Sequence, residues 1–203
     1  MGHSFPFTDI LKSIPGTFGI RLEEEPKFDV VETSDEIEVR RYRPALLAEI
    51  TLPGGHDRAV DQAFDRLSAY IFGENSTQAK MHMTIPVYQR EGVSDAPWMK
   101  AKSGEWTIGF FLGNDLAPED VPKPTDKSIQ LRTVPARSIA VVRYTGNNTD
   151  ERRAEARDKL RGWLALHPEY RADTSVYWAQ YDAPFVVPFL KRNEAQVALI
   201  ETV

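Results

Sequence analysis

The sequence predicts an α+β domain in which two units of strand–strand–helix–strand order share one core. Three observations support this class: two amphipathic helical segments, short β-type segments around each helix, and a weak internal repeat offset by about 92 residues. Each unit alone would expose an apolar sheet face. Pairing the units buries both faces and leaves a cleft between the halves, which is a natural position for a ligand.

The first unit is expected over residues 27–112, after an N-terminal arm at 1–25 that is broken at Pro15 and Gly16. Strands are expected at 27–32, 36–42 and 46–52, and again at 81–89, 97–102 and 105–112. Between the two sets lies the clearest helix, at 57–72, whose apolar residues recur at helical spacing: Val60, Phe64, Leu67 and Ile71. Asp57 is its expected N-cap and Gly73 its expected C-cap.

The second unit is expected over residues 128–203, so that a single domain covers 26–203. A proline-rich loop at 117–126 separates the units. Strands are expected at 128–134, 138–144, 175–181 and 195–202, with a helix that opens at Thr149 or Asp150 and ends near 166. The last two strands are separated by an apolar loop at 185–190.

Composition excludes several classes of function. The net charge of −5 argues against general nucleic-acid binding, which needs a basic surface. The chain has no cysteine, which removes disulfides, thiolate metal sites and iron–sulfur clusters and fits a reducing compartment such as the cytoplasm. No stretch approaches the roughly 20 apolar residues of a membrane span, and the N-terminus lacks the pattern of a secretory signal.

Five segments in order carry a family resemblance. They are Glu38–Val39–Arg40–Arg41–Tyr42, the helix end at 67–75, Lys80–Met81–His82–Met83–Thr84–Ile85–Pro86–Val87, Gln180–Tyr181–Asp182–Ala183–Pro184, and Arg192–Asn193–Glu194. Together they resemble the SOUL heme-binding protein family. The resemblance implies a distorted antiparallel β-barrel of two similar halves with two flanking helices, similar in fold to GyrI-like effector-binding domains. It also implies a non-enzymatic carrier or buffer of heme or another tetrapyrrole, held mainly by apolar contacts.

The resemblance places tetrapyrrole contacts on the first helix and on the late loop. On the helix these are Phe64, which also suits packing on the sheet, and Arg66, the main basic residue left to meet a propionate. Around the loop they are Tyr181, Phe185 and Phe189. Tyr181 also suits a turn, and the apolar loop either folds onto the body or forms one wall of a flat site.

His82 is the best histidine candidate for an iron ligand. The four histidines lack the spacing of a protein-only metal site. On a strand, His82 and Thr84 would face away from the apolar side of Met81 and Met83. His82 would then reach iron if a tetrapyrrole docked on the outer side, and would otherwise be an ordinary exposed imidazole.

Arg41 stands where one family member has a proposed histidine ligand. It shares its predicted strand face with Ile37 and Val39, and a charge in such a setting needs a partner. Two interpretations remain open for Arg41. One is a buried ion pair with Glu194 or Asp182, and the other is a clamp for a ligand carboxylate.

Two other functions compete with tetrapyrrole binding. The GyrI-like resemblance includes hydrolases, so the cleft between the halves would hold an effector or a hydrolysed small molecule, with Glu194, Tyr144 and Tyr181 as candidate groups. The apolar loop at 185–190 also suits a protein partner.

Overall fold

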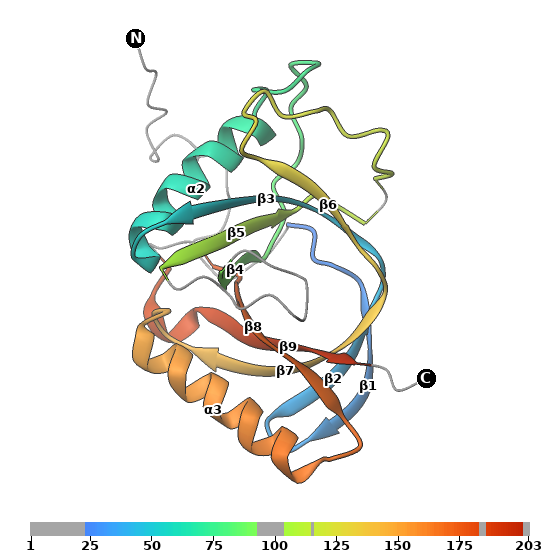
Figure 1. The fold of residues 1–203 in the computed structure, drawn as a ribbon, viewed down its shortest axis with the longest axis vertical. Coiled ribbons are helices and arrows are strands. Elements are labelled where there is room, and N and C mark those ends of the chain that lie inside the picture. Colours follow the sequence, from blue (N-terminus) through green and yellow to red (C-terminus); the bar gives the residue numbers. More distant parts are fainter. Residues whose placement is uncertain (1–22, 93–103, 115, 183–185, 201–203) are drawn as a thin grey trace.

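The computed structural model describes residues 23–92, 104–114, 116–182 and 186–200 (Figure 1). The described part forms one nine-stranded antiparallel sheet, strongly curled, with two helices on its outer side. The arm predicted at 1–25 lies almost entirely outside the described residues, and so does the strand predicted at 97–102. No helix in the described ranges is long and apolar enough to cross a membrane.

Most predicted elements are present, with ends shifted by a few residues. The strands and helices are β1 (Phe28–Ser34), β2 (Ile37–Tyr42), β3 (Ala45–Pro53), α2 (His56–Ile71), β4 (Val87–Glu91), β5 (Glu105–Phe111), β6 (Gln130–Val134), β7 (Arg137–Thr145), α3 (Asp150–Leu166), β8 (Arg171–Gln180) and β9 (Arg192–Ile200). A 3₁₀ turn, η2 (Pro188–Leu190), lies in the loop between β8 and β9.

The strand order shows the two similar halves. The sheet runs β1-β2-β7-β9-β8-β4-β5-β3-β6. Strands β2, β3, β4 and β5 of the first half correspond to β6, β7, β8 and β9 of the second. Replacing each strand by its counterpart reverses the order from β2 to β6, so the two halves occupy equivalent positions in the sheet. The first strand of each half pairs with the other half, β2 with β7 and β6 with β3. Within each half the chain crosses from the part of the sheet under one helix to the part under the other at a short corner, residues 43–44 between β2 and β3 and residues 135–136 between β6 and β7.

The outer face of the sheet carries two apolar cores, one under each helix. α2 contacts β3 and β5, whereas α3 contacts β7, β8 and β9 (Figure 1). The first core contains Ile50, Leu67 and Ile108, and the second contains Leu160, Val142 and Val197. The sequence predicted one shared core, whereas the buried apolar residues form these two cores and two smaller clusters, one around Val141 and one around Phe111.

Helix α2 buries Leu67 and Ile71 as predicted, but its first two turns bury alanines more deeply than Val60 and Phe64. Ala59, Ala63 and Leu67 are fully buried, while Val60 and Phe64 are half-buried against the same core. Four-residue spacing keeps the small side chains on one face, which lets the helix approach the sheet closely. Gly55, not Asp57, is the N-cap, and it has no side chain to accept a hydrogen bond.

Helix α3 begins as the sequence predicts. The Thr149 hydroxyl accepts a hydrogen bond from the backbone N–H of Arg152, which satisfies one of the free donors of the first turn. Its buried face contains Ala156, Leu160 and Trp163.

The strand predicted at 81–89 begins only at Val87. Pro86 has no N–H to donate to a sheet ladder, so regular pairing starts after it. The side-chain alternation predicted before that point holds for three residues and is wrong for Thr84. Thr84 is buried and its hydroxyl donates to the carbonyl of Phe111, whereas His82 is exposed. Met81 and Met83 pack against the first core, as the alternation predicts.

Candidate functional site

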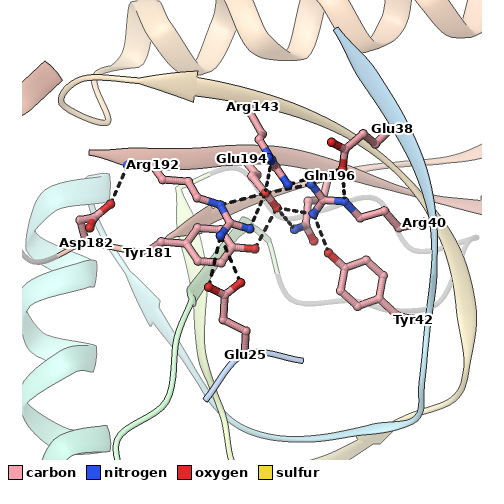
Figure 2. Close-up of polar contacts among 10 residues, drawn as sticks. All are labelled: Glu25, Glu38, Arg40, Tyr42, Arg143, Tyr181, Asp182, Arg192, Glu194 and Gln196. Atoms are coloured by element: carbon pink, nitrogen blue, oxygen red, sulfur yellow. Dashed lines mark hydrogen bonds and ion pairs between the residues drawn. The ribbon is translucent and has the colours of Figure 1, made fainter. Parts of the chain in front are cut away.

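A buried network of charges lies on the inner face of the sheet, around the carboxylate of Glu194 (Figure 2). Glu194 is on the central strand β9, and none of its side chain is exposed. In the antiparallel register Glu194 lies opposite Arg143 of β7 and Ala179 of β8. Cross-strand partners share one face of a sheet, so β7 and β9 direct these side chains to the same side.

Three arginines surround the Glu194 carboxylate. Arg40 of β2 donates to both of its oxygens, at 2.9 and 3.1 Å. Arg192, two residues before Glu194 on β9, donates to Oε1 through two nitrogens, at 2.9 and 3.2 Å. The partly exposed Arg143 adds a contact at 3.3 Å. Paired guanidinium donors match a carboxylate geometrically, so the charge of Glu194 is heavily compensated.

Neutral donors complete the shell of Glu194. The Tyr181 hydroxyl and the Gln196 amide donate to Oε2, at 2.8 and 2.9 Å. The Tyr42 hydroxyl accepts from Arg40 at 3.0 Å. Every acceptor position of this buried carboxylate therefore faces a donor, which is the condition for keeping a charge inside a protein.

Two further carboxylates balance the arginines. Glu38 contacts Arg40 at 2.7 Å and Arg143 at 3.5 Å. Glu25 contacts Arg192 at 3.2 Å. Arg192 also lies 3.7 Å from the centre of the Tyr181 ring, where the ring face attracts a cation. The network therefore holds together residues from before β1, from β2, β7 and β9, and from the segment that follows β8.

The electrostatic environment fixes the protonation of the network. Burial alone would raise the pKa of Glu194, but Arg40 and Arg192 outweigh burial and lower this pKa to about 2. Burial, followed by the charge of Glu194, raises the pKa of Tyr42 to about 12. The pKa of Tyr181 is raised well above its ordinary value for the same reasons. At neutral pH the carboxylate is ionised and both phenols keep their protons.

Glu194 forms the predicted buried ion pair with Arg40 and not with Arg41. Strand β2 alternates, so Arg40 shares the inner face with Glu38 and Tyr42, whereas Arg41 lies on the other face. The Arg41 guanidinium donates to the Ser138 hydroxyl at 3.2 Å. The prediction of a buried ion pair at Glu194 was correct in kind, and the neighbouring residue supplies the cation.

The candidate catalytic set of Glu194, Tyr144 and Tyr181 does not assemble. Tyr181 contacts Glu194, but Tyr144 is opposite Asn193 in the register and packs with the core under α3. Tyr144 and Glu194 are therefore on opposite faces of the sheet. A carboxylate with a pKa of about 2 is also a weak proton acceptor at neutral pH. The geometry gives no support to Glu194 as a general base.

Tyr181 and Asp182 anchor the loop that joins β8 to β9. The Tyr181 N–H donates to the Arg192 carbonyl at 3.2 Å, and the Arg192 N–H donates to Asp182 at 2.6 Å. On the far side of the loop, the Lys191 ammonium donates to the Asn147 side chain at 2.9 Å. The loop therefore leaves from a base that is fixed by hydrogen bonds and by the charge network.

The tip of this loop presents apolar side chains to solvent. Phe189 is 74% exposed, Leu190 52% and Val187 48%. Phe185 lies outside the described residues. The sequence left open whether the loop folds onto the body or forms a wall. The exposure of its described residues supports the second alternative.

The other residues predicted to contact a tetrapyrrole either have partners within the protein or lie apart from the loop. The ring of Phe64 lies 5.4 Å from that of Phe110, in helix-to-sheet packing. Arg66 donates to both oxygens of Asp126, at 2.7 and 2.9 Å, which ties α2 to the loop before β6. No contact among the described residues joins His82 to the loop. The described ranges also contain no group of three or more acidic or histidine side chains suited to a metal ion.

Sequence reasoning missed Arg40, Arg143 and Arg192 as members of the network. Their signal was the strand alternation itself, since Glu38, Arg40 and Tyr42 share one face of β2. The sequence analysis considered only the opposite face, which carries Ile37, Val39 and Arg41. The curl of the sheet buries Arg40 and Tyr42 on the polar face.

Solved structures place the chain in a fold class. The C-terminal domain of EcmrR superposes with a TM-score of 0.59 at 12% identity, covering 82% of this chain and 98% of that domain. An uncharacterized conserved protein from Listeria innocua gives 0.58 at 12% identity, covering 81% and 92%. A hydrolase from Listeria innocua gives 0.53 at 10% identity, covering 84% and 94%. These likenesses define the GyrI-like half-barrel fold.

The family follows from the sequence. The model of the SOUL heme-binding protein family matches residues 23–198, so the chain belongs to that family. Heme-binding protein 2 of Mus musculus is 24% identical over 174 residues, covering 85% of this chain and 82% of the relative. Heme-binding protein 1 of Bos taurus is 26% identical over 138 residues, covering 68% and 69%.

Proposed function

We propose that this protein binds heme or a related tetrapyrrole and acts as a non-enzymatic carrier. Membership in the SOUL family supports the ligand class, and the absence of cysteine suits a reducing compartment such as the cytoplasm. The observation that carries the proposal is the exposed apolar tip formed by Val187, Phe189 and Leu190. Water solvates such a tip poorly, so covering it with a flat macrocycle is favourable.

The order of the tip would favour contact with the face of a porphyrin. The 3₁₀ turn of η2 is held by hydrogen bonds from Leu190 to Val187, at 2.9 Å, and from Lys191 to Pro188, at 3.1 Å. Its base is held by Asp182 and Arg192. An apolar surface that is already ordered loses less conformational entropy when it binds.

Axial coordination of iron is not needed for this mode of binding. His82 is exposed and remains the histidine proposed for iron. The ring of His56, near the start of α2, has both nitrogens engaged, at 2.7 Å from Asp57 and 2.7 Å from Gln89. We therefore expect apolar contact to supply most of the affinity and the iron to supply little.

Titration with heme and with metal-free protoporphyrin tests the proposal. The Soret band should change saturably at micromolar ligand, and the two ligands should bind with similar affinity. Phe189→Ser should weaken both by on the order of tenfold or more, since it removes a large apolar contact. The matched control is Leu166→Ser, because Leu166 is 79% exposed at the end of α3.

Three outcomes would reject this function or its mode. Absence of saturable binding rejects tetrapyrrole binding. Equal losses in Phe189→Ser and Leu166→Ser reject the loop as the site. Binding of heme but not protoporphyrin, abolished in His82→Ala, rejects apolar contact as the main source of affinity.

A further inference from the structure

A pocket lies inside the curl of the sheet, and unlike the apolar tip it is lined by charged and polar side chains as well as apolar ones. The pocket, of about 580 Å³ including the part open to solvent, is lined by both halves. Part of its wall comes from the two corners that join β2 to β3 and β6 to β7. Tyr42, Arg43 and Ala45 surround one corner, and Val134 and Arg137 surround the other.

The pocket carries an excess of positive charge. Its lining contains two arginines, Arg43 and Arg137, and neither guanidinium has a carboxylate partner within 4 Å among the described residues. The Arg137 guanidinium lies 5.4 Å from the centre of the Tyr177 ring, which leaves its donors available. The one carboxylate in the lining, Glu49, is held by Arg132 through two contacts, at 2.6 and 2.7 Å.

Neutral donors add to this preference for an anion. The Tyr42 hydroxyl accepts from Arg40, so its own proton is free to donate. Burial raises the pKa of Tyr88 well above its ordinary value, so this phenol also keeps its proton. The neighbouring Glu194 network is charge-compensated (Figure 2). Gln196 belongs both to this network and to the lining of the pocket. No uncompensated carboxylate of the lining faces the pocket to attract a cation.

The remaining walls are apolar and aromatic. Leu47, Val134, Ile139 and Ala198 contribute aliphatic surface, and the rings of Tyr88 and Tyr177 contribute flat surface. We propose that this pocket binds a small aromatic carboxylate. The ring would lie among the apolar side chains while the carboxylate meets Arg43 and Arg137. This site is independent of the tetrapyrrole proposed for the loop.

Calorimetric titration of the whole chain with three naphthalene probes of one shape tests the proposal. 1-Naphthoate should bind with one-to-one stoichiometry, whereas 1-naphthylmethylammonium and 1-naphthalenemethanol should bind at least tenfold more weakly. Arg137→Gln and Arg43→Gln should each weaken 1-naphthoate by roughly tenfold, as expected for loss of a charged hydrogen bond. Arg161→Gln, at an exposed position on α3, is the matched control and should leave the affinity unchanged.

Two further variants separate the pocket from folding and from the loop. Ala45→Phe fills the pocket without removing charge and should abolish 1-naphthoate binding while thermal unfolding stays cooperative. Phe189→Ser should leave 1-naphthoate affinity unchanged. The proposal is overturned if 1-naphthoate fails to bind, if the ammonium probe binds equally well, or if the Arg43→Gln/Arg137→Gln variant retains full affinity.

Discussion

Glu194 and the loop tip at 186–190 are neighbours in sequence, yet the side chains around Glu194 are buried whereas those of the tip are exposed. In the network each charged group meets an opposite charge within 4 Å, and Glu194, Arg40 and Arg192 lie largely out of water. At the tip, apolar side chains lie in water with little cover. The two regions meet at Asp182 and Arg192, which form the base of the loop.

This difference indicates that the network stabilises the fold, whereas the tip is available to a ligand. A buried ion pair leaves an uncompensated charge when one partner is removed, so the network tolerates little change. The side chains of the tip are largely exposed, so we expect them to contribute little to the stability of the fold. A stable base with a dispensable tip is suited to binding, and four experiments test this contrast.

Removal of the Glu194 carboxylate should have the largest effect. Glu194→Ala leaves Arg40 buried without its main partner, and we expect the free energy of unfolding to fall by about 3–5 kcal/mol. Urea denaturation measures this loss. Glu36→Ala, which breaks the exposed pair of Glu36 with Lys159, should cost less than about 1 kcal/mol. Similar losses in the two variants would show that the network is not a centre of stability.

Acid should remove much of the same stabilisation. The pKa of Glu194 is about 2 in the folded chain, below the ordinary value of 4.5. Its contribution is therefore complete above pH 4.5 and is lost as the pH falls toward 2, by on the order of 3 kcal/mol. The difference in unfolding free energy between the natural chain and Glu194→Gln should narrow over this range. A difference that stays constant with pH would contradict the lowered pKa.

The surface pair of Arg66 with Asp126 should have a small effect. Both partners are partly exposed, so Arg66→Gln should lower the free energy of unfolding by no more than about 1 kcal/mol. The Arg66 guanidinium already serves Asp126, so we also expect a smaller change in heme affinity than Phe189→Ser produces. A larger change would restore Arg66 as the propionate contact that the family resemblance implies.

The tip should have the smallest effect on stability. Phe189→Ser should change the free energy of unfolding by less than about 0.5 kcal/mol, because the side chain makes little contact with the body. Thermal and urea unfolding measure this change on the same samples used for the Soret titration. A loss of several kcal/mol would mean that the loop supports the fold, and the contrast with the network would disappear.

Much of the fold was predictable because the helices and strands carry local signals. The apolar stripe of α2 and the cap of α3 at Thr149 depend on neighbours in sequence, and the family motifs indicated the architecture. The segment before β4 was predicted wrongly because Pro86 ends the alternation there. For the site, the sequence identified Glu194 and Tyr181 but paired the carboxylate with Arg41 in place of Arg40.

The sequence by itself determined which residues alternate, which helices are amphipathic and which loop is apolar, since these follow from spacing along the chain. Only the tertiary structure decided which sheet face became the inside. The curl closes over the face that carries Glu194 and leaves the helices on the other face, so Glu194 meets arginines from strands that lie far away in sequence. Such contacts depend on strand order and register, which local patterns do not encode.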